Sequence, residues 1–119
     1  MYQKYNFENL KVYHLARELL KEIYNLSKEF PKEEIFVLTS QIRRAVISVL
    51  LNIAEGSIKS KKEFARFIGI SIGSLLEVKT CLNIASDLDY IKENDFRGII
   101  EKIDELFFKL LNLKKYLKK

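Results

Sequence analysis

The 119-residue chain contains little histidine, cysteine, proline or glycine. His14 and Cys81 are its one histidine and one cysteine, so an internal disulfide is excluded and no pair of imidazoles or thiolates is offered to a metal. One proline and four glycines provide few turns and favour a few long elements. No glycine-rich phosphate loop is present. We therefore expect no catalytic residue, no cofactor and no metal, and interpret His14 and Cys81 as ordinary surface or core residues.

Charge and hydropathy are those of a water-soluble globular domain. Apolar residues make up 48% of the chain and charged residues 31%. The net charge is +5, and the excess is concentrated in residues 91–119, which carry eight basic and five acidic groups. No uninterrupted apolar run reaches roughly 18 residues, and the first six residues lack the apolar core of a secretory signal. We expect a cytoplasmic protein without a membrane partner, whose basic bias is compatible with nucleic acid.

Apolar residues recur at alternating spacings of three and four in four segments, the pattern of a helix with one buried stripe. No period-two stretch competes, so no sheet is expected. The predicted helices span about 7–29, 35–56, 61–88 and 95–117, with the start of the second left open between Lys32 and Thr39. Short connections then predict an all-α, up-down-up-down antiparallel four-helix bundle, a single domain over residues 1–119.

Local signals mark the ends of these helices. Pro31 ends the first, and Gly56 is the expected C-cap of the second. Residues 60–63, Ser-Lys-Lys-Glu, form a predicted capping box at the start of the third. Gly69 and Gly73 lie inside the third helix, where each glycine costs about 1 kcal/mol of helix propensity against alanine. We expect another helix to approach closely there in compensation.

The second predicted helix is apolar on two faces. One face belongs to the core, whereas the other has no obvious partner in a chain of this size. That second face predicts self-association into a homo-oligomer. The candidate interface residues, from the second and third helices, are Ile47, Leu51, Ala54, Phe67 and Ile70.

A narrow polar line separates these two faces and has a carboxylate neighbour in the third helix. We interpret it as a structural hydrogen-bond network, because buried charges persist only when they are paired. A functional pocket, or a metal shared by Glu55 and Glu77, is the less favoured alternative. The network residues are Gln41, Arg44, Ser48, Asn52, Glu55 and Glu77.

Two basic groups are candidates for contact with phosphate, one at the start of the third helix and one in the tail. Each alone is typical of solvated surface, but repetition in an oligomer would make them linked weak contacts. No aromatic stacking platform or groove-reading motif is evident, so backbone phosphate contacts should dominate. The candidates are Lys59, Lys61, Lys62 and Arg66, and then Lys114, Lys115, Lys118 and Lys119.

Several motifs resemble those of the 23S rRNA-intervening-sequence proteins, a four-helix-bundle family. The clearest are LTSQIRRA at 38–45 and NIAEG at 52–56. Where the family has proline and serine, this chain has Leu50 and Leu51, which should leave the second helix straighter and its outer apolar patch larger. Further matches are FENLKVY at 7–13, FP at 30–31, GSLLE at 73–77 and LDYI at 88–91.

The resemblance implies a ring-shaped homopentamer, a number that periodicity does not supply. It also implies a relation to the accessory protein of diversity-generating retroelement reverse transcriptases, a basic pentameric bundle that binds nucleic acid and the polymerase. Our first hypothesis is a non-catalytic oligomeric scaffold that binds DNA or RNA, rRNA-associated RNA included. The alternative is a protein-binding adaptor ring without nucleic-acid contact, whose partner would be a protein such as a reverse transcriptase.

Overall fold

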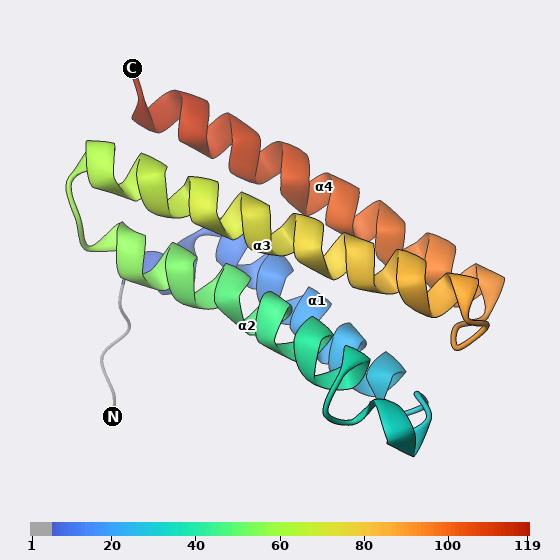
Figure 1. The fold of residues 1–119 in the computed structure, drawn as a ribbon. Coiled ribbons are helices and arrows are strands. Elements are labelled where there is room, and N and C mark those ends of the chain that lie inside the picture. Colours follow the sequence, from blue (N-terminus) through green and yellow to red (C-terminus); the bar gives the residue numbers. More distant parts are fainter. Residues whose placement is uncertain (1–5) are drawn as a thin grey trace, which may run out of the picture.

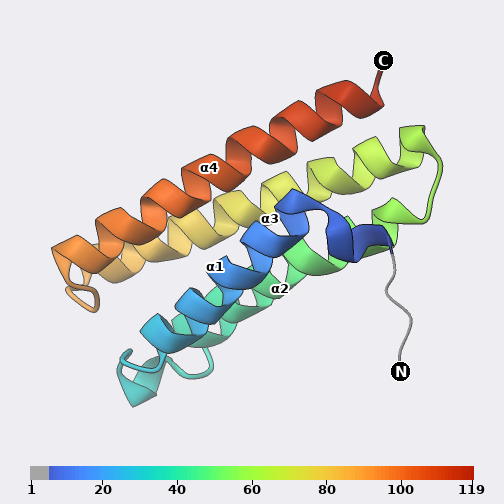
Figure 2. The same ribbon diagram turned by 180° about the vertical axis from the view of Figure 1, so that it is seen from behind.

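A computed structural model describes residues 6–119, and these form helices and turns without a strand. The four α-helices are α1 (Lys11–Ser27), α2 (Leu38–Ser57), α3 (Lys61–Asp87) and α4 (Glu93–Leu117). Successive helices run in opposite directions (Figure 1). The helices lie in two layers, with α2 and α3 in one and α1 and α4 in the other (Figure 1 and Figure 2). The prediction of an all-α chain with four helices is confirmed, and their arrangement is that of a four-helix bundle.

One apolar core holds the four helices together. Each helix contacts the next, and α1 also contacts α4. The buried positions follow the three-and-four spacing of the sequence, so each helix places one stripe inside. Burying one large aliphatic side chain contributes about 1.5–3 kcal/mol. The largest fully buried side chains are Leu19, Ile23, Ile42, Val46, Val49, Ile53, Ile68, Leu75, Leu82, Ile103, Leu106 and Leu110.

The first two helices begin later than the sequence pattern predicts. A short 3-10 helix, Asn6–Asn9, precedes α1, because the backbone of Leu10 is extended and separates the two. Another, Lys32–Glu34, follows Pro31, and α2 begins only at Leu38. The Leu38 N–H donates to a Glu34 carboxylate oxygen at 3.5 Å, so Glu34 supplies an acceptor to the first turn of α2. From there α2 continues without interruption past Leu50.

Gly56 is not the C-cap of α2. The helix continues to Ser57, Ile58 takes the cap position, and no glycine in residues 6–119 has a positive φ. A Cβ built on Gly56 would lie 2.6 Å from the Phe67 Cβ and 2.9 Å from the Phe64 ring. Gly56 is therefore needed for the close approach of α3 to α2, and not for a left-handed turn.

Gly69 and Gly73, the two glycines inside α3, do not have the close helix contact that the sequence predicts. A Cβ on Gly69 would meet only the side chain of Lys114, with the ammonium nitrogen at 3.0 Å. A Cβ on Gly73 would meet nothing within 4 Å, and Gly73 is exposed. No helix backbone within residues 6–119 approaches either glycine, so the expected close packing is absent from the protomer.

The turn between α3 and α4 is a Schellman motif with aspartate in place of the usual glycine. Asp89 has φ 61°, its N–H donates to Ser86 O at 3.0 Å, and the Tyr90 N–H donates to Ala85 O at 2.9 Å. The Tyr90 ring lies 5.8 Å from that of Phe30, and its hydroxyl donates to Glu34 at 2.8 Å. This bond raises the pKa of Tyr90. The α3–α4 turn is thus tied to the α1–α2 connection.

By length and composition alone, α3 could cross a membrane, with a mean hydropathy of 1.4 over an 18-residue window. In the fold it packs between α2 and α4, and Ile68, Leu75 and Leu82 on it are fully buried in the core. The core helix of a soluble protein satisfies the same criterion.

Candidate nucleic-acid interface

The two basic groups of the sequence meet at one end of the bundle. Because α3 begins where α4 finishes, the first turns of α3 and the last turn of α4 lie side by side (Figure 1). Between them is a cavity of about 560 Å³. This basic pocket is lined by Lys61, Lys62, Ala65, Arg66, Lys114, Leu117, Lys118 and Lys119.

The start of α3 adds backbone donors to this pocket. The Ser60 hydroxyl accepts the Glu63 N–H at 3.2 Å, which confirms Ser60 as the N-cap. The other half of the predicted capping box is absent, because the Glu63 carboxylate pairs with Arg66 Nε at 3.0 Å instead. The remaining free amides and the positive end of the helix dipole favour an anion at this place.

Most cations of the basic pocket lack a counter-charge. Among residues 6–119, Arg66 is the one pocket residue with an ion pair, and that pair is exposed. Exposed pairs contribute little, about 0–1 kcal/mol. The Arg66 guanidinium lies 4.7 Å from the Phe67 ring centroid, and the Lys61 ammonium 5.4 Å from that of Tyr116. Both charged groups therefore lie beside aromatic rings, and such cation–π contacts at exposed sites contribute about 0.5–1 kcal/mol.

Two of the eight predicted cations lie outside the basic pocket. Lys59, in the α2–α3 turn, lies 5.9 Å from the Phe67 ring centroid, and Lys115 is exposed on α4. The sequence analysis missed one residue, Tyr116, whose side chain is exposed beside Lys61. Its position next to the run of tail lysines was the available signal.

The predicted polar network is present in part. Gln41 Nε2 donates to Glu77 at 3.0 Å, the Ser48 hydroxyl lies 2.8 Å from that of Ser74, and Asn52 Nδ2 donates to Ser48 O at 2.9 Å. Ser74 was not among the predicted members. Arg44 and Glu55 are exposed, and their side chains make no hydrogen bond or ion pair with any residue of 6–119.

Within residues 6–119, Glu55 and Glu77 belong to no cluster of candidate metal ligands. The Glu77 carboxylate is bonded to Gln41, and the part of the chain that the structure describes holds no group of three His, Cys, Asp or Glu side chains suited to a metal ion. Cys81 is buried, and burial together with the Glu77 charge raises the pKa of its thiol. His14 is exposed beside the Tyr13 ring.

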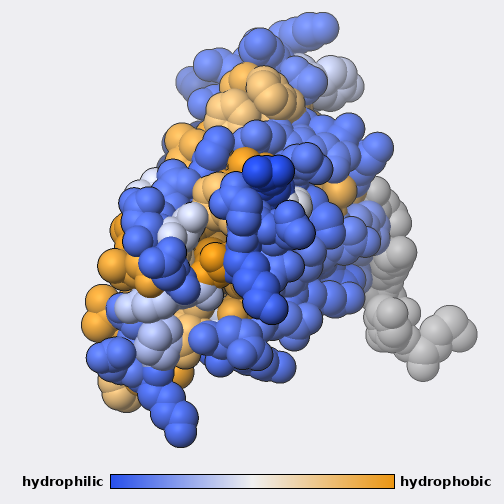
Figure 3. Space-filling view, turned by 90° about the vertical axis from the view of Figure 1, so that its right-hand side faces the viewer, coloured by the Kyte–Doolittle hydropathy of each residue, from blue (hydrophilic) through white to orange (hydrophobic). Residues whose placement is uncertain are grey.

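Of the predicted interface residues, Leu51 is 61% exposed, Ile70 is exposed, and Ile47 and Ala54 are half-buried. Phe67 is buried against Gly56 within the protomer, so it offers little to a partner. Phe36 was not among the predicted residues, although at 91% it is the most exposed large hydrophobic residue that the structure describes. The signal was the run Ile35-Phe36-Val37 just before α2. Figure 3 shows hydrophobic side chains along its left edge, on the side of α2 and α3.

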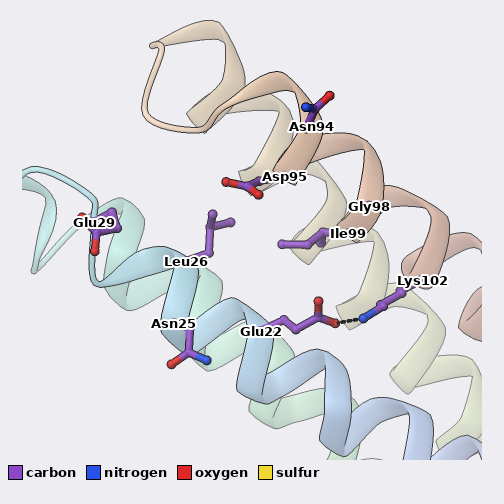
Figure 4. A pocket seen from close by; sticks show the side chains of 9 residues that line it. All are labelled: Glu22, Asn25, Leu26, Glu29, Asn94, Asp95, Gly98, Ile99 and Lys102. Atoms are coloured by element: carbon purple, nitrogen blue, oxygen red, sulfur yellow. Dashed lines mark hydrogen bonds and ion pairs between the residues drawn. The ribbon is translucent and has the colours of Figure 1, made fainter.

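A second cavity, of about 480 Å³, lies between α1 and α4 (Figure 4). Leu26 and Ile99 project into it, and Lys102 donates to Glu22 at 2.7 Å, a bond that raises the pKa of Lys102. Glu29 and Asp95 also line it. The groove is lined by three carboxylates and one ammonium, so its net negative charge would repel phosphate. The basic pocket is therefore the better candidate for a nucleic acid.

Comparison with known proteins identifies the family and a structural neighbour of the chain. The sequence profile described as 23S rRNA-intervening sequence protein matches residues 8–112. A solved structure from Bacteroides thetaiotaomicron VPI-5482, described as a protein with unknown function from the S23 ribosomal protein family, shares 24% identity and superposes with a TM-score of 0.80. The match covers 87% of this chain and 98% of that one, and shows a common fold. No curated protein matches. Since the family match includes residues of all four helices, the chain belongs to the 23S rRNA-intervening sequence protein family.

Proposed function

We propose that this protein is a non-catalytic, cytoplasmic scaffold that assembles as a homo-oligomer and binds RNA or DNA through the basic pocket. The observation that carries the proposal is the convergence of six basic side chains from the start of α3 and the end of α4 around one cavity. Phosphate is the ligand that such a pocket attracts, and binding should release counterions. The family's link to the 23S rRNA intervening sequence makes RNA the first ligand to test.

The outer face of α2 and α3 supports self-association. Leu51 and Ile70 expose aliphatic surface there, and Gly73 leaves room for an approaching helix. A second copy of the chain would bury this surface and repeat the basic pocket around the assembly. A ring of five is the number that the family resemblance implies, and repetition would turn weak phosphate contacts into linked ones.

Binding is tested by mobility shift with structured RNA, single-stranded DNA and duplex DNA at about 50 mM and about 200 mM salt. We expect a shift at low salt that weakens steeply at high salt. Reversing Lys61 and Lys62 to glutamate should weaken binding and flatten its dependence on salt. The matched control reverses Lys28 and Lys32, exposed cations at the other end of the bundle. A parent protein that shifts none of the three probes would refute the proposal.

A protein-binding adaptor is the second candidate, and the apolar run Ile35-Phe36-Val37 favours it. Exposed hydrophobic residues at a connection are typical of contact surfaces. The partner would be a protein such as a reverse transcriptase, and its binding would change little with salt. Salt dependence of binding therefore separates the two candidates.

A further inference from the structure

One aromatic side chain adjoins the basic pocket and has no role in the core. Tyr116 lies in the last turn of α4 and is 58% exposed, whereas its neighbour Leu117 is buried. Tyr13, Tyr24 and Tyr90, the other tyrosines of residues 6–119, are half-buried against the core. Burial of Leu117 fixes the helix end, so it presents the Tyr116 ring to solvent at a defined place.

The ring lies beside one of the lysines that line the pocket. The Lys61 ammonium lies 5.4 Å from the Tyr116 centroid, and Lys61 itself lines the cavity. Within residues 6–119, Tyr116 makes no contact with another aromatic ring. The residue is 58% exposed, so much of its surface is accessible to a base. The phosphates beside a stacked base would then be within the field of the pocket lysines.

We infer that Tyr116 is a base-stacking platform, and that the basic pocket therefore takes single-stranded RNA or DNA in preference to duplex. This inference rests on the proposed function. An exposed aromatic ring beside a cationic groove is the combination by which proteins hold single strands without reading their sequence. Bases in a duplex are already stacked on one another, so the ring gains nothing from them. Duplex binding would depend on phosphate alone.

The test uses the full chain with three probes of equal length: a single-stranded oligonucleotide, the same strand with abasic sites, and the corresponding duplex. Tyr116→Leu removes the ring and Tyr116→Phe retains it. We expect Tyr116→Leu to lose roughly 5- to 150-fold in affinity for the single strand, the range typical of losing one base–aromatic stack. Its affinity for the abasic strand and the duplex should not change, and Tyr116→Phe should bind like the parent.

The outcomes separate the two proposals. If the parent binds nucleic acid but Tyr116→Leu binds the single strand as well as the parent does, the stacking platform is refuted and the proposed function stands. An equal loss on all three probes also refutes it, because the residue would then act on phosphate binding. If the parent binds none of the probes, the proposed function fails, and the inference with it. Helical circular dichroism should be unchanged in both variants, since Tyr116 lies outside the core.

Discussion

The two ends of the bundle differ in charge and in how they are held. At one end the α1–α2 connection and the α3–α4 turn expose Ile35, Phe36 and Val37, together with Leu88. That end, called here the apolar end, is fixed by the Tyr90–Glu34 hydrogen bond and the Phe30–Tyr90 contact. The basic pocket occupies the other end, where Arg66 is the one lining residue of 6–119 with an ion pair, and that pair is exposed.

The surface proposed for phosphate and the surface that favours a protein partner therefore lie at opposite ends of the bundle. The helices that join the ends share one core, so either surface can be altered without rebuilding the other. Substitutions on exposed residues should then affect one property at a time, whereas substitutions in the core should lower the folded fraction and so reduce both together.

The largest effect is expected in the core. Leu82 is fully buried, so Leu82→Ala should lower the free energy of unfolding by about 2–5 kcal/mol through lost burial and the cavity left behind. Thermal melting followed by circular dichroism measures the change. Both ends should keep their properties in the fraction that remains folded. Loss of nucleic-acid binding alone, with an unchanged melting temperature, would contradict the shared core.

The next effect concerns assembly. Leu51→Lys places an unpaired charge on the outer face of α2, which should weaken self-association at least about tenfold if that face is buried between copies. Light scattering measures the mass. Asn25→Lys, which adds the same charge on exposed α1, serves as the control. A parent mass near 14.0 kDa at micromolar concentration would show that no assembly exists to be weakened.

A smaller change, in the stabilising direction, is expected at the α3–α4 turn. Asp89 has a positive φ, a conformation that costs a residue with a side chain about 1–2 kcal/mol and costs glycine little. Asp89→Gly should therefore stabilise the fold by about 1 kcal/mol, less the extra freedom that glycine gives the unfolded chain. Chemical denaturation measures it. Asp89→Ala should not stabilise, and a gain of equal size from alanine would reject the backbone explanation.

The smallest effect is expected at the Tyr90–Glu34 hydrogen bond, which joins the α3–α4 turn to the α1–α2 connection. Tyr90→Phe removes the hydroxyl that donates to Glu34 and should lower the melting temperature slightly. The bond raises the pKa of Tyr90, so its contribution is complete below the ordinary tyrosine pKa of about 10 and is lost as pH rises through the raised value. Parent and variant should therefore converge in strong alkali. If the difference in melting temperature between parent and variant grows as pH rises, the predicted role of the Tyr90 hydroxyl as a donor is contradicted.

The sequence predicted the helices because their buried stripes repeat with the period of the helix. Residues such as Leu19, Leu75 and Leu106 are fully buried where the spacing places them. Gly56 was misinterpreted because glycine serves both turns and close packing, and only the distance to Phe67 distinguishes these uses. The start of α2 was uncertain because the acceptor for its first turn is the side chain of Glu34, which precedes the helix.

The site was only partly predictable, for reasons of topology. The lysines were identified, but whether Lys61 and Lys118 line one cavity depends on α3 beginning beside the end of α4. The predicted antiparallel order already contained that information. Tyr116 was missed because exposure, which makes it useful, follows from the rotation of the last turn of α4 and not from its residue type. Arg44 and Glu55 were assigned to the network from their spacing, although their side chains face solvent.

Cys81 gives the protein a built-in probe of local opening. It is the one cysteine in the chain, it is buried on α3, and the pKa of its thiol is raised, so a thiol reagent should react slowly with it unless the helices around it separate into a more open state. When reclosing is faster than labelling, the labelling rate measures the population of that open state in the unmodified protein. Measured with and without RNA, it would show whether a ligand held at the basic pocket changes opening at a distant part of the same bundle.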